Sequence, residues 1–292
     1  MTNIKIAYVV LHYKNAEITT KCLKYLNEIM GDESAAIVVD NYSQNDSLDE
    51  IQKNIGVSDK IYFIRSDTNL GFANGNNLGY KYAREELNAN CIIVMNNDIF
   101  ISDIDFEKKL RKSNLVNNYS IIAPDVVTLS GKHQNPFRCK KLSTWRLFVS
   151  MSLQYLYSFT FRIGHMIPWI VRKYRSEGKI NTQKEYDISG NIIPHGSCVI
   201  FTSKYTEREH FAFVPATFFY GEEDLLYDYC MFRNHSIVYC PELKVTHAEK
   251  QSTGAISQSE LTILRFRSQN KASSLRICLK YRLFPNKFKH LF

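Results

Sequence analysis

The sequence lacks the signatures of several common protein classes. No uninterrupted apolar run reaches the roughly 18 residues of a membrane span. No Gly-x-Gly-x-x-Gly follows the first predicted strand, which argues against a dinucleotide-binding fold with its usual fingerprint. The seven cysteines show no Cys-x-x-Cys spacing, and this favours reduced, buried thiols and a cytosolic compartment. There is no internal repeat, and the chain enters a predicted strand at once, without the pattern of a signal peptide.

The composition is that of a globular protein with an excess of positive charge. The chain has 292 residues, of which 45% are hydrophobic and 23% charged, enough for one large domain or a domain with appendages. The net charge of +8 favours anionic partners such as nucleoside diphosphates, acidic lipid or nucleic acid. The basic residues concentrate at 138–184 and 265–290, whereas the first half of the chain carries the distinctive motifs.

Strand and helix patterns alternate over the first hundred residues. Apolar runs predict strands at 4–11, 35–39, 60–65 and 91–95, and helical spacing predicts helices at 17–30, 46–54 and 73–87. This order predicts an α/β fold, in which helices flank a mostly parallel central sheet. Further elements are predicted as helices at 105–116, 222–233 and 258–283, and as strands at 120–127, 192–201 and 237–240.

One segment is too rich in glycine and asparagine for a helix that only packs. Residues 69–79 read Asn-Leu-Gly-Phe-Ala-Asn-Gly-Asn-Asn-Leu-Gly. Gly75 and Gly79 are explained by close packing of a helix against the sheet. The asparagines are harder to explain in this way, because Asn is a poor helix former.

Polar residues also follow two of the predicted strands. Asp40-Asn-Tyr-Ser43 comes after the second strand, and a carboxylate there can accept the imide N–H of a uracil or thymine ring. A helix-entry loop is the alternative, since these are also capping residues. Asn96-Asn97-Asp98 follows the buried fourth strand, at the sheet edge where open α/β folds present their ligands. A capping turn is the alternative here.

Three consecutive acids, Glu222-Glu223-Asp224, follow an aromatic run. Their mutual repulsion is costly unless one faces solvent and another faces a site. Acids at a helix N-terminus, which favour the helix dipole, are the alternative explanation.

Together these motifs resemble the nucleotide-sugar half of an inverting family 2 glycosyltransferase with the GT-A fold. Eleven consecutive positions, 69–79, agree with the pattern that the family carries near its donor. The resemblance covers residues 4–130 and 190–250 and implies a UDP- or dTDP-sugar donor. The residues expected to contact the nucleotide sugar are Tyr13, Asp40, Asn41, Ser43, Asn69, Gly71, Phe72, Asn76, Asn77 and Asn97.

The resemblance also implies a metal and a catalytic base. Asp98 stands in the family's Asp-x-Asp motif, with Asn96 in place of the first acid, and is expected to bind Mg²⁺ or Mn²⁺. His247 matches a position near the diphosphate in related enzymes, so we expect it at the metal site. The second acid of the family's pair maps to Glu223 as the base that activates an acceptor hydroxyl. Glu222 and Asp224 stay open as alternatives.

The resemblance suggests a cytoplasmic, rhamnosyltransferase-like enzyme of bacterial capsule or O-antigen synthesis, with a glycan acceptor carried on polyprenyl diphosphate. We expect a GT-A domain over 1–250, divided into a donor half at 1–130, a basic aromatic helical insertion at 136–186 and an acceptor half at 190–250, and a basic helical tail at 251–292. The insertion suits contact with an anionic membrane surface at the inner face of the cell membrane, or a helical lid with a basic face. No nucleic-acid-binding motif is present.

Two other functions fit the same sheet. A sugar nucleotidyltransferase should carry a glycine-rich triphosphate loop after the first strand, but His12-Tyr-Lys-Asn15 contains no glycine. A non-catalytic membrane- or nucleic-acid-binding module would not need to keep both Asp98 and the acids at 222–224.

Overall fold

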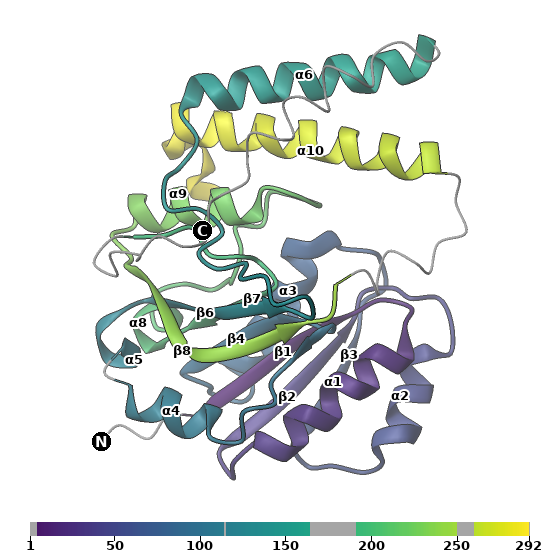
Figure 1. Ribbon diagram of the computed structural model, residues 1–292, viewed down its shortest axis with the longest axis vertical. Helices are drawn as coiled ribbons and strands as arrows, with labels where there is room; N and C mark the ends of the chain where they lie inside the picture. Colours follow the sequence, from purple (N-terminus) through teal and green to yellow (C-terminus); the bar gives the residue numbers. More distant parts are fainter. Residues whose placement is uncertain (1–4, 114, 164–190, 250–259, 292) are drawn as a thin grey trace.

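The computed structural model describes residues 5–113, 115–163, 191–249 and 260–291, and they form an α/β fold around one eight-stranded sheet (Figure 1). The strand order is β3-β2-β1-β4-β7-β6-β8-β5. All strands run in the same direction except β7 and β5, so the sheet is mixed, with a wholly parallel half formed by β3, β2, β1 and β4. The strands are β1 (Ile6–His12), β2 (Ser34–Asp40), β3 (Ile61–Arg65), β4 (Cys91–Asn96), β5 (Ile99–Phe100), β6 (Ile121–Thr128), β7 (Cys198–Phe201) and β8 (Ile237–His247).

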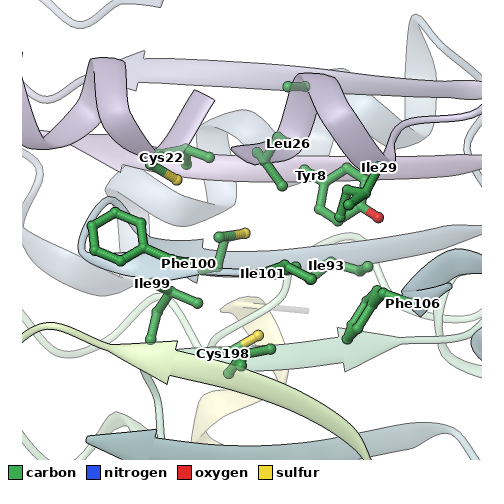
Figure 2. Close-up of a cluster of buried hydrophobic side chains, with 14 of the residues drawn as sticks. Tyr8, Cys22, Leu26, Ile29, Ile93, Ile99, Phe100, Ile101, Phe106 and Cys198 are labelled. Atoms are coloured by element: carbon green, nitrogen blue, oxygen red, sulfur yellow. The ribbon is translucent and has the colours of Figure 1, made fainter. Parts of the chain in front are cut away.

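Helices cover both faces of this sheet because the central strands are apolar on both sides. On one face, Tyr8 and Ile93 pack against Leu26 of α1 (Figure 2). On the other face, Val9 packs with Tyr80 of α3. The helices are α1 (Ala16–Ile29), α2 (Ser47–Ile55), α3 (Gly71–Glu85), α4 (Phe106–Lys112), α5 (Leu115–Asn118), α6 (Thr144–Ile163), α8 (Ser203–Thr206), α9 (Glu222–Phe232), α10 (Glu260–Leu283) and the 3-10 helix η2 (Pro285–Leu291).

A second, smaller core lies away from the sheet. Leu147 of α6, Tyr229 of α9 and Leu275 of α10 contribute to it. Figure 1 shows α6 and α10 side by side, with α9 between them and the sheet. Helix α6 comes from the predicted insertion and α10 from the predicted tail, so two segments far apart in the sequence form one layer.

The α/β order of the first hundred residues is confirmed, but several predicted boundaries are wrong. The helix predicted at 105–116 is divided into α4 and α5, because Ser113 adopts an extended backbone conformation. The strand predicted at 192–201 is shorter, since only Cys198–Phe201 joins the sheet and Ile193 makes an isolated bridge with Arg138. Strand β8 continues to His247, seven residues beyond the predicted end. The part of the insertion at 164–186 lies outside the described residues.

The seven cysteines are all free thiols, as the sequence indicates. Six are buried and Cys139 is exposed. No helix among the described residues is both long and apolar enough to cross a bilayer.

Candidate active site

The ends of three neighbouring parallel strands place the predicted donor residues on one edge of the sheet. His12 at the end of β1 is in register with Asp40 at the end of β2, and Leu11 is in register with Asn96 of β4. Tyr13, Asp40 and Asp98 therefore follow the sheet along one edge. This is the edge at which open α/β sheets bind ligands.

The Asp40 carboxylate is buried and held in place by its own loop. Its Oδ1 accepts hydrogen bonds from the backbone N–H of Ser43, at 3.1 Å, and from the Ser43 hydroxyl. The Ser43 hydroxyl in turn accepts from the backbone N–H of Lys14, at 2.8 Å. Because Lys14 follows Tyr13, these bonds tie the loop after β1 to the loop after β2. A preorganised carboxylate of this kind can select a nucleobase by hydrogen bonding.

Asn41 and Asn69 fix the start of α3. The Asn41 amide accepts from the N–H of Leu70 at 2.8 Å and donates to the carbonyl of Gly71 at 3.0 Å. Asn69 Oδ1 accepts from the N–H of Gly71 at 2.9 Å and from Asn41 at 3.3 Å. These two predicted donor residues thus lie together and hold the first turn of the helix beside the sheet edge.

Gly71 has a conformation and a contact that other residues could not adopt without strain. Its φ is +73°, and a Cβ built on it would lie 2.3 Å from the carbonyl oxygen of Phe218. The next residue, Phe72, donates its N–H to the same oxygen at 2.8 Å. The motif at 69–79 therefore contacts the loop 217–221, which leads directly into the three acids of α9.

The remaining positions of the motif divide between packing and structural hydrogen bonds. Built Cβ atoms at Gly75 and Gly79 would collide with Leu11 and Val9 of β1, as the packing explanation predicts. Asn76 donates to the Phe72 carbonyl within the helix at 2.9 Å, and its buried Oδ1 has no hydrogen-bond partner.

Asn77 is committed to the protein backbone. Its amide donates to the carbonyl of Phe213 at 2.7 Å and accepts from the N–H groups of Ala212 and Phe213, both at 2.9 Å. Asn97 is likewise engaged in the interior, where it donates to the Thr19 hydroxyl at 2.9 Å. Thr19 also bonds to His12, at 2.8 Å. The structure therefore places these two predicted donor residues in supporting hydrogen-bond networks.

Asp98 and His247 come together at the centre of the same edge. Strand β5 pairs with the end of β8, so that Ile99 lies opposite His247. His247 Nε2 is 3.3 Å from Asp98 Oδ1, and Oδ1 is buried without a hydrogen-bond partner. Two potential metal ligands thus face each other, one of them an orphaned carboxylate oxygen.

The surroundings of His247 indicate which ring nitrogen carries the proton. Its Nδ1 lies 2.6 Å from Gln134 Oε1, and the Gln134 amide nitrogen donates to Glu249 at 2.8 Å. That bond orients the amide, so Nδ1 donates to Gln134, and the ring turns Nε2 toward Asp98. Metal-binding histidines are commonly held in this way by a second hydrogen bond.

The residues at this pair fit a hard divalent cation. The Asp98 carboxylate oxygen is a ligand that Mg²⁺ and Mn²⁺ prefer, and substrate phosphates would supply further oxygen ligands; the His247 nitrogen would add a ligand more suited to Mn²⁺ than to Mg²⁺. No group of three or more His, Cys, Asp or Glu that could hold a metal occurs among the described residues. A metal held by only these two side chains would need further ligands, such as phosphate oxygens of a bound substrate.

The three acids at the start of α9 have different environments. Asp224 forms an ion pair with Arg138. Glu222 is buried, and burial together with the charge of Glu223 raises its pKa to about 8. Glu223 is partly exposed, and burial and the neighbouring Asp224 raise its pKa as well. Like charges in a poorly solvated place account for both shifts.

The segment 195–197 connects the acids to the Asp98–His247 pair. A Cβ built on Gly196 would lie 2.9 Å from Glu223 Oε1, and the Glu223 carboxylate accepts a hydrogen bond from the Gly196 backbone. The carbonyl of Ser197 accepts from the N–H of Asn96, at 2.9 Å. The His195 ring meets that of His247 edge-on, with centroids 5.8 Å apart. Burial lowers the pKa of His195 to about 4, so it is neutral at physiological pH.

The sequence analysis did not identify the residues that support these groups. Gln134 orients His247, Asn135 accepts from the His195 N–H at 2.6 Å, and Arg138 pairs with Asp224. All three lie between β6 and α6, where no motif or periodicity marks them. Their partners are distant in the sequence, so only the tertiary structure reveals their roles.

Known proteins resemble the chain in both sequence and fold. The hexosyltransferase Agl10 of Haloferax volcanii, a protein of low-salt glycan biosynthesis, is 25% identical over 270 residues, which cover 92% of this chain and 75% of that protein. The mannosyltransferase PcManGT of Pyrobaculum calidifontis, solved with GDP-Man and Mn²⁺, superposes with a TM-score of 0.52 at 12% identity, covering 97% of this chain and 70% of the other. TarS 1-349 of S. aureus, solved with UDP, also gives a TM-score of 0.52 at 12% identity, covering 97% and 73%.

At such low identity the two solved structures establish the fold, which is that of the GT-A glycosyltransferases. The family model described as Glycosyl transferase family 2 matches residues 8–175. This match begins in β1 and includes β2, α3, β4 and the Asp98 motif, more than half of the chain. The chain therefore belongs to glycosyl transferase family 2, and it is a glycosyltransferase.

Proposed function

We propose that this enzyme is an inverting transferase that moves a sugar from a UDP- or dTDP-sugar to a hydroxyl group of a glycan acceptor. The main support for this proposal is that residues 195–197 contact both the Asp98–His247 pair and Glu223. The Asp98–His247 pair lies at one end of this segment, and Glu223 lies against Gly196. The proposed metal ligands and the candidate base are thus adjacent at one edge of the sheet.

Glu223 is the best placed of the three acids to act as the base. Asp224 is neutralised by Arg138, and Glu222 is almost completely enclosed. Glu223 is partly exposed, and its pKa is raised from the ordinary carboxyl value, mainly by burial. A carboxylate with a raised pKa accepts a proton from an attacking hydroxyl more readily. In an inverting transfer, this group would take the proton as the hydroxyl oxygen attacks the anomeric carbon.

Asp98 and His247 would hold the Mg²⁺ or Mn²⁺ ion. Such an ion supplies neutralisation of the charge that develops on the leaving diphosphate. The Mn²⁺ found with GDP-Man in PcManGT supports the use of a divalent metal. Within this chain, Gln134 and Glu249 hold the His247 ring so that its Nε2 is directed at Asp98.

The loops after β1 and β2 would bind the nucleotide. Asp40, fixed by Ser43, would accept the imide N–H of uracil or thymine, and Tyr13 would lie against the base. The UDP bound to TarS supports a uridine donor, although GDP-Man in PcManGT shows that the fold also accommodates guanine. The hexosyl group transferred by Agl10 supports a hexose as the transferred sugar.

The acceptor would be a growing glycan on a lipid carrier, polyprenyl diphosphate, in surface polysaccharide synthesis. The role of Agl10 in glycan biosynthesis supports a glycan acceptor. Such a carrier would place the enzyme at the inner face of the cell membrane.

Thermal denaturation with nucleotides tests the donor site. UDP, dTDP, GDP and CMP are each added with and without Mn²⁺, to the wild type and to Asp98→Ala. We expect UDP or dTDP to raise the melting temperature only with Mn²⁺, and the Asp98→Ala variant to lose that shift. If no nucleotide shifts the wild type, or if the variant responds equally, the metal and donor assignments are wrong.

Glu223→Gln tests the base separately. Because the amide keeps the shape but cannot accept the proton, we expect transfer to fall by about 10²–10⁴-fold, while the metal-dependent nucleotide shift is retained. Glu86→Gln, an exposed position at the end of α3, is the matched control and should leave transfer unchanged. Full activity in Glu223→Gln would rule out its role as the base.

A further inference from the structure

Helices α6 and α10 form a layer that leaves an apolar stripe in solvent. Leu147 and Met151 of α6 pack into the small core with α10. The side of α6 turned away from this core carries Trp145 and Leu156, which are 71% and 52% exposed, and between that side and the core lie Phe148 and Tyr155, 44% and 43% exposed. The spacing of these four positions places them on one side of the helix. A contiguous exposed apolar stripe of this kind marks an interaction surface.

Together with η2, which follows α10 and contacts it, this layer carries the whole excess of positive charge of the chain. Helices α6, α10 and η2 contain ten Lys and Arg residues and one acid, Glu260. The rest of the chain holds 27 of the 37 basic residues and 28 of the 29 acidic residues, so it is nearly neutral. On α10, Arg265, Arg276 and Lys280 are exposed and lie on one side of the helix. The charge is therefore a property of this layer and not of the enzyme as a whole.

We propose that the α6–α10 layer docks on an anionic lipid surface, with the α6 stripe entering the interface and the cations of the layer contacting lipid head groups. This deepens the proposed function, on which it rests, by naming the face that would meet a membrane-borne acceptor. Apolar residues beside clustered cations are the features that bind interfacial helices to anionic bilayers. A second copy of the chain fits poorly, because two strongly cationic layers repel each other.

The docking face is connected to the catalytic residues through α10. Ser274 donates to the carbonyl of Phe219 at 2.8 Å, and the Phe219 ring packs on Phe266 with centroids 6.0 Å apart. Arg282 forms an ion pair with Asp228 of α9. The helix that meets the lipid thus also holds the loop 217–221 and the helix that begins with the three acids. Docking would therefore orient the acids relative to an acceptor in the membrane.

Vesicle co-sedimentation of the full chain tests this proposal. Vesicles of phosphatidylcholine alone are compared with vesicles that also contain phosphatidylglycerol, at about 0.1 M and about 0.5 M salt. We expect binding to the anionic vesicles only, weakened by salt. Arg276→Glu/Lys280→Glu and Trp145→Ala/Phe148→Ala should each reduce binding by about tenfold or more, given the contribution of single cations and buried apolar groups.

Matched controls distinguish an effect of the α6–α10 layer from an effect of the protein's overall charge. Lys108→Glu/Lys112→Glu reverses two exposed cations with the same spacing on α4, and it should bind as the wild type does. All variants should keep the wild-type melting temperature, because the altered side chains are exposed. Glu223→Gln should also bind normally, so loss of transfer and loss of docking are distinguishable.

Several outcomes would overturn the proposal. Equal binding to both kinds of vesicle, no binding, or wild-type binding by both layer variants would each contradict it. A dimer that Trp145→Ala/Phe148→Ala converts to a monomer would identify a second copy as the occupant. Binding of RNA but not of anionic vesicles, lost in the charge variant, would identify nucleic acid instead.

Discussion

Replacing Gly71 by alanine should damage the enzyme more than the backbone conformation alone explains. With φ at +73°, any residue with a Cβ incurs a cost of about 1–2 kcal/mol. The new Cβ would also lie 2.3 Å from the carbonyl oxygen and 2.6 Å from the ring of Phe218. Relieving this overlap requires movement of the backbone, and overpacking of this kind costs about 1–3 kcal/mol.

Gly131 provides the matched control. Its φ is +80°, but a Cβ built on it meets nothing within 4 Å. Gly131→Ala should therefore lose only the conformational term of about 1–2 kcal/mol, whereas Gly71→Ala should lose about 2–5 kcal/mol in total. Denaturant unfolding of both variants and the wild type, at the same pH, measures the two differences in free energy of unfolding.

The contact that makes Gly71→Ala more destabilising than Gly131→Ala should also affect the rate of transfer. Phe218 precedes the three acids by only a few residues, and its carbonyl is bonded to the Phe72 N–H. Displacing it shifts the loop 217–221, so transfer should fall in Gly71→Ala under conditions where the protein stays folded, and remain normal in Gly131→Ala. Equal destabilisation of the two variants would refute the argument, because it would show that Phe218 yields without cost.

Three further perturbations test the local arguments. The pKa of Glu222 is raised from its ordinary 4.5 to about 8, so the folded protein binds this proton more tightly than the unfolded chain does. The proton therefore contributes its full stabilisation below pH 4.5, and this stabilisation is lost as the pH rises through 8. The melting temperature of the wild type should fall between pH 7 and 8.5 more steeply than that of Glu222→Gln. Ser274→Ala removes the hydrogen bond to Phe219, so it should lower the free energy of unfolding by about 1 kcal/mol and lower kcat with KM unchanged. The control Ser268→Ala loses its hydrogen bond to Gln154 of α6 and should leave kcat intact. Equal losses of kcat in the two variants would contradict the role of Ser274. Asn77→Ala leaves buried backbone groups of Ala212 and Phe213 unpaired and should destabilise the fold by roughly 1–3 kcal/mol. Nucleotide affinity, measured by titration calorimetry, should stay unchanged. A large loss of affinity would show instead that Asn77 contacts the donor.

The parallel half of the sheet was predictable because its signals are local. Each of β1, β2 and β4 is an apolar run that is buried along its length, followed by polar residues at the sheet edge. The predicted strand boundaries were wrong where a residue is buried without being paired to a neighbouring strand. Ile192 and Ile193 are buried like strand residues but lie outside the sheet, and the apolar pattern alone cannot distinguish the two cases.

Strand β8 shows the opposite error. Its second part alternates between exposed Glu242 and Lys244 and buried Leu243 and Val245, which is the pattern of a strand, but Pro241 interrupts it. The structure accommodates the proline at a register shift opposite Pro124 and Asp125 of β6. Irregular pairing of this kind depends on the partner strand, so the sequence of β8 alone did not indicate that the strand continues to His247.

The sequence by itself determined the order of strands and helices, the glycine- and asparagine-rich motif at 69–79 and the acids at 222–224, because each is encoded by neighbouring residues. Only the tertiary structure decided which distant groups meet. It placed His247 against Asp98, Arg138 against Asp224, and α6 against α10. These contacts join residues that are far apart in the chain, and their energies depend on burial and distance, which exist only once the sheet has formed.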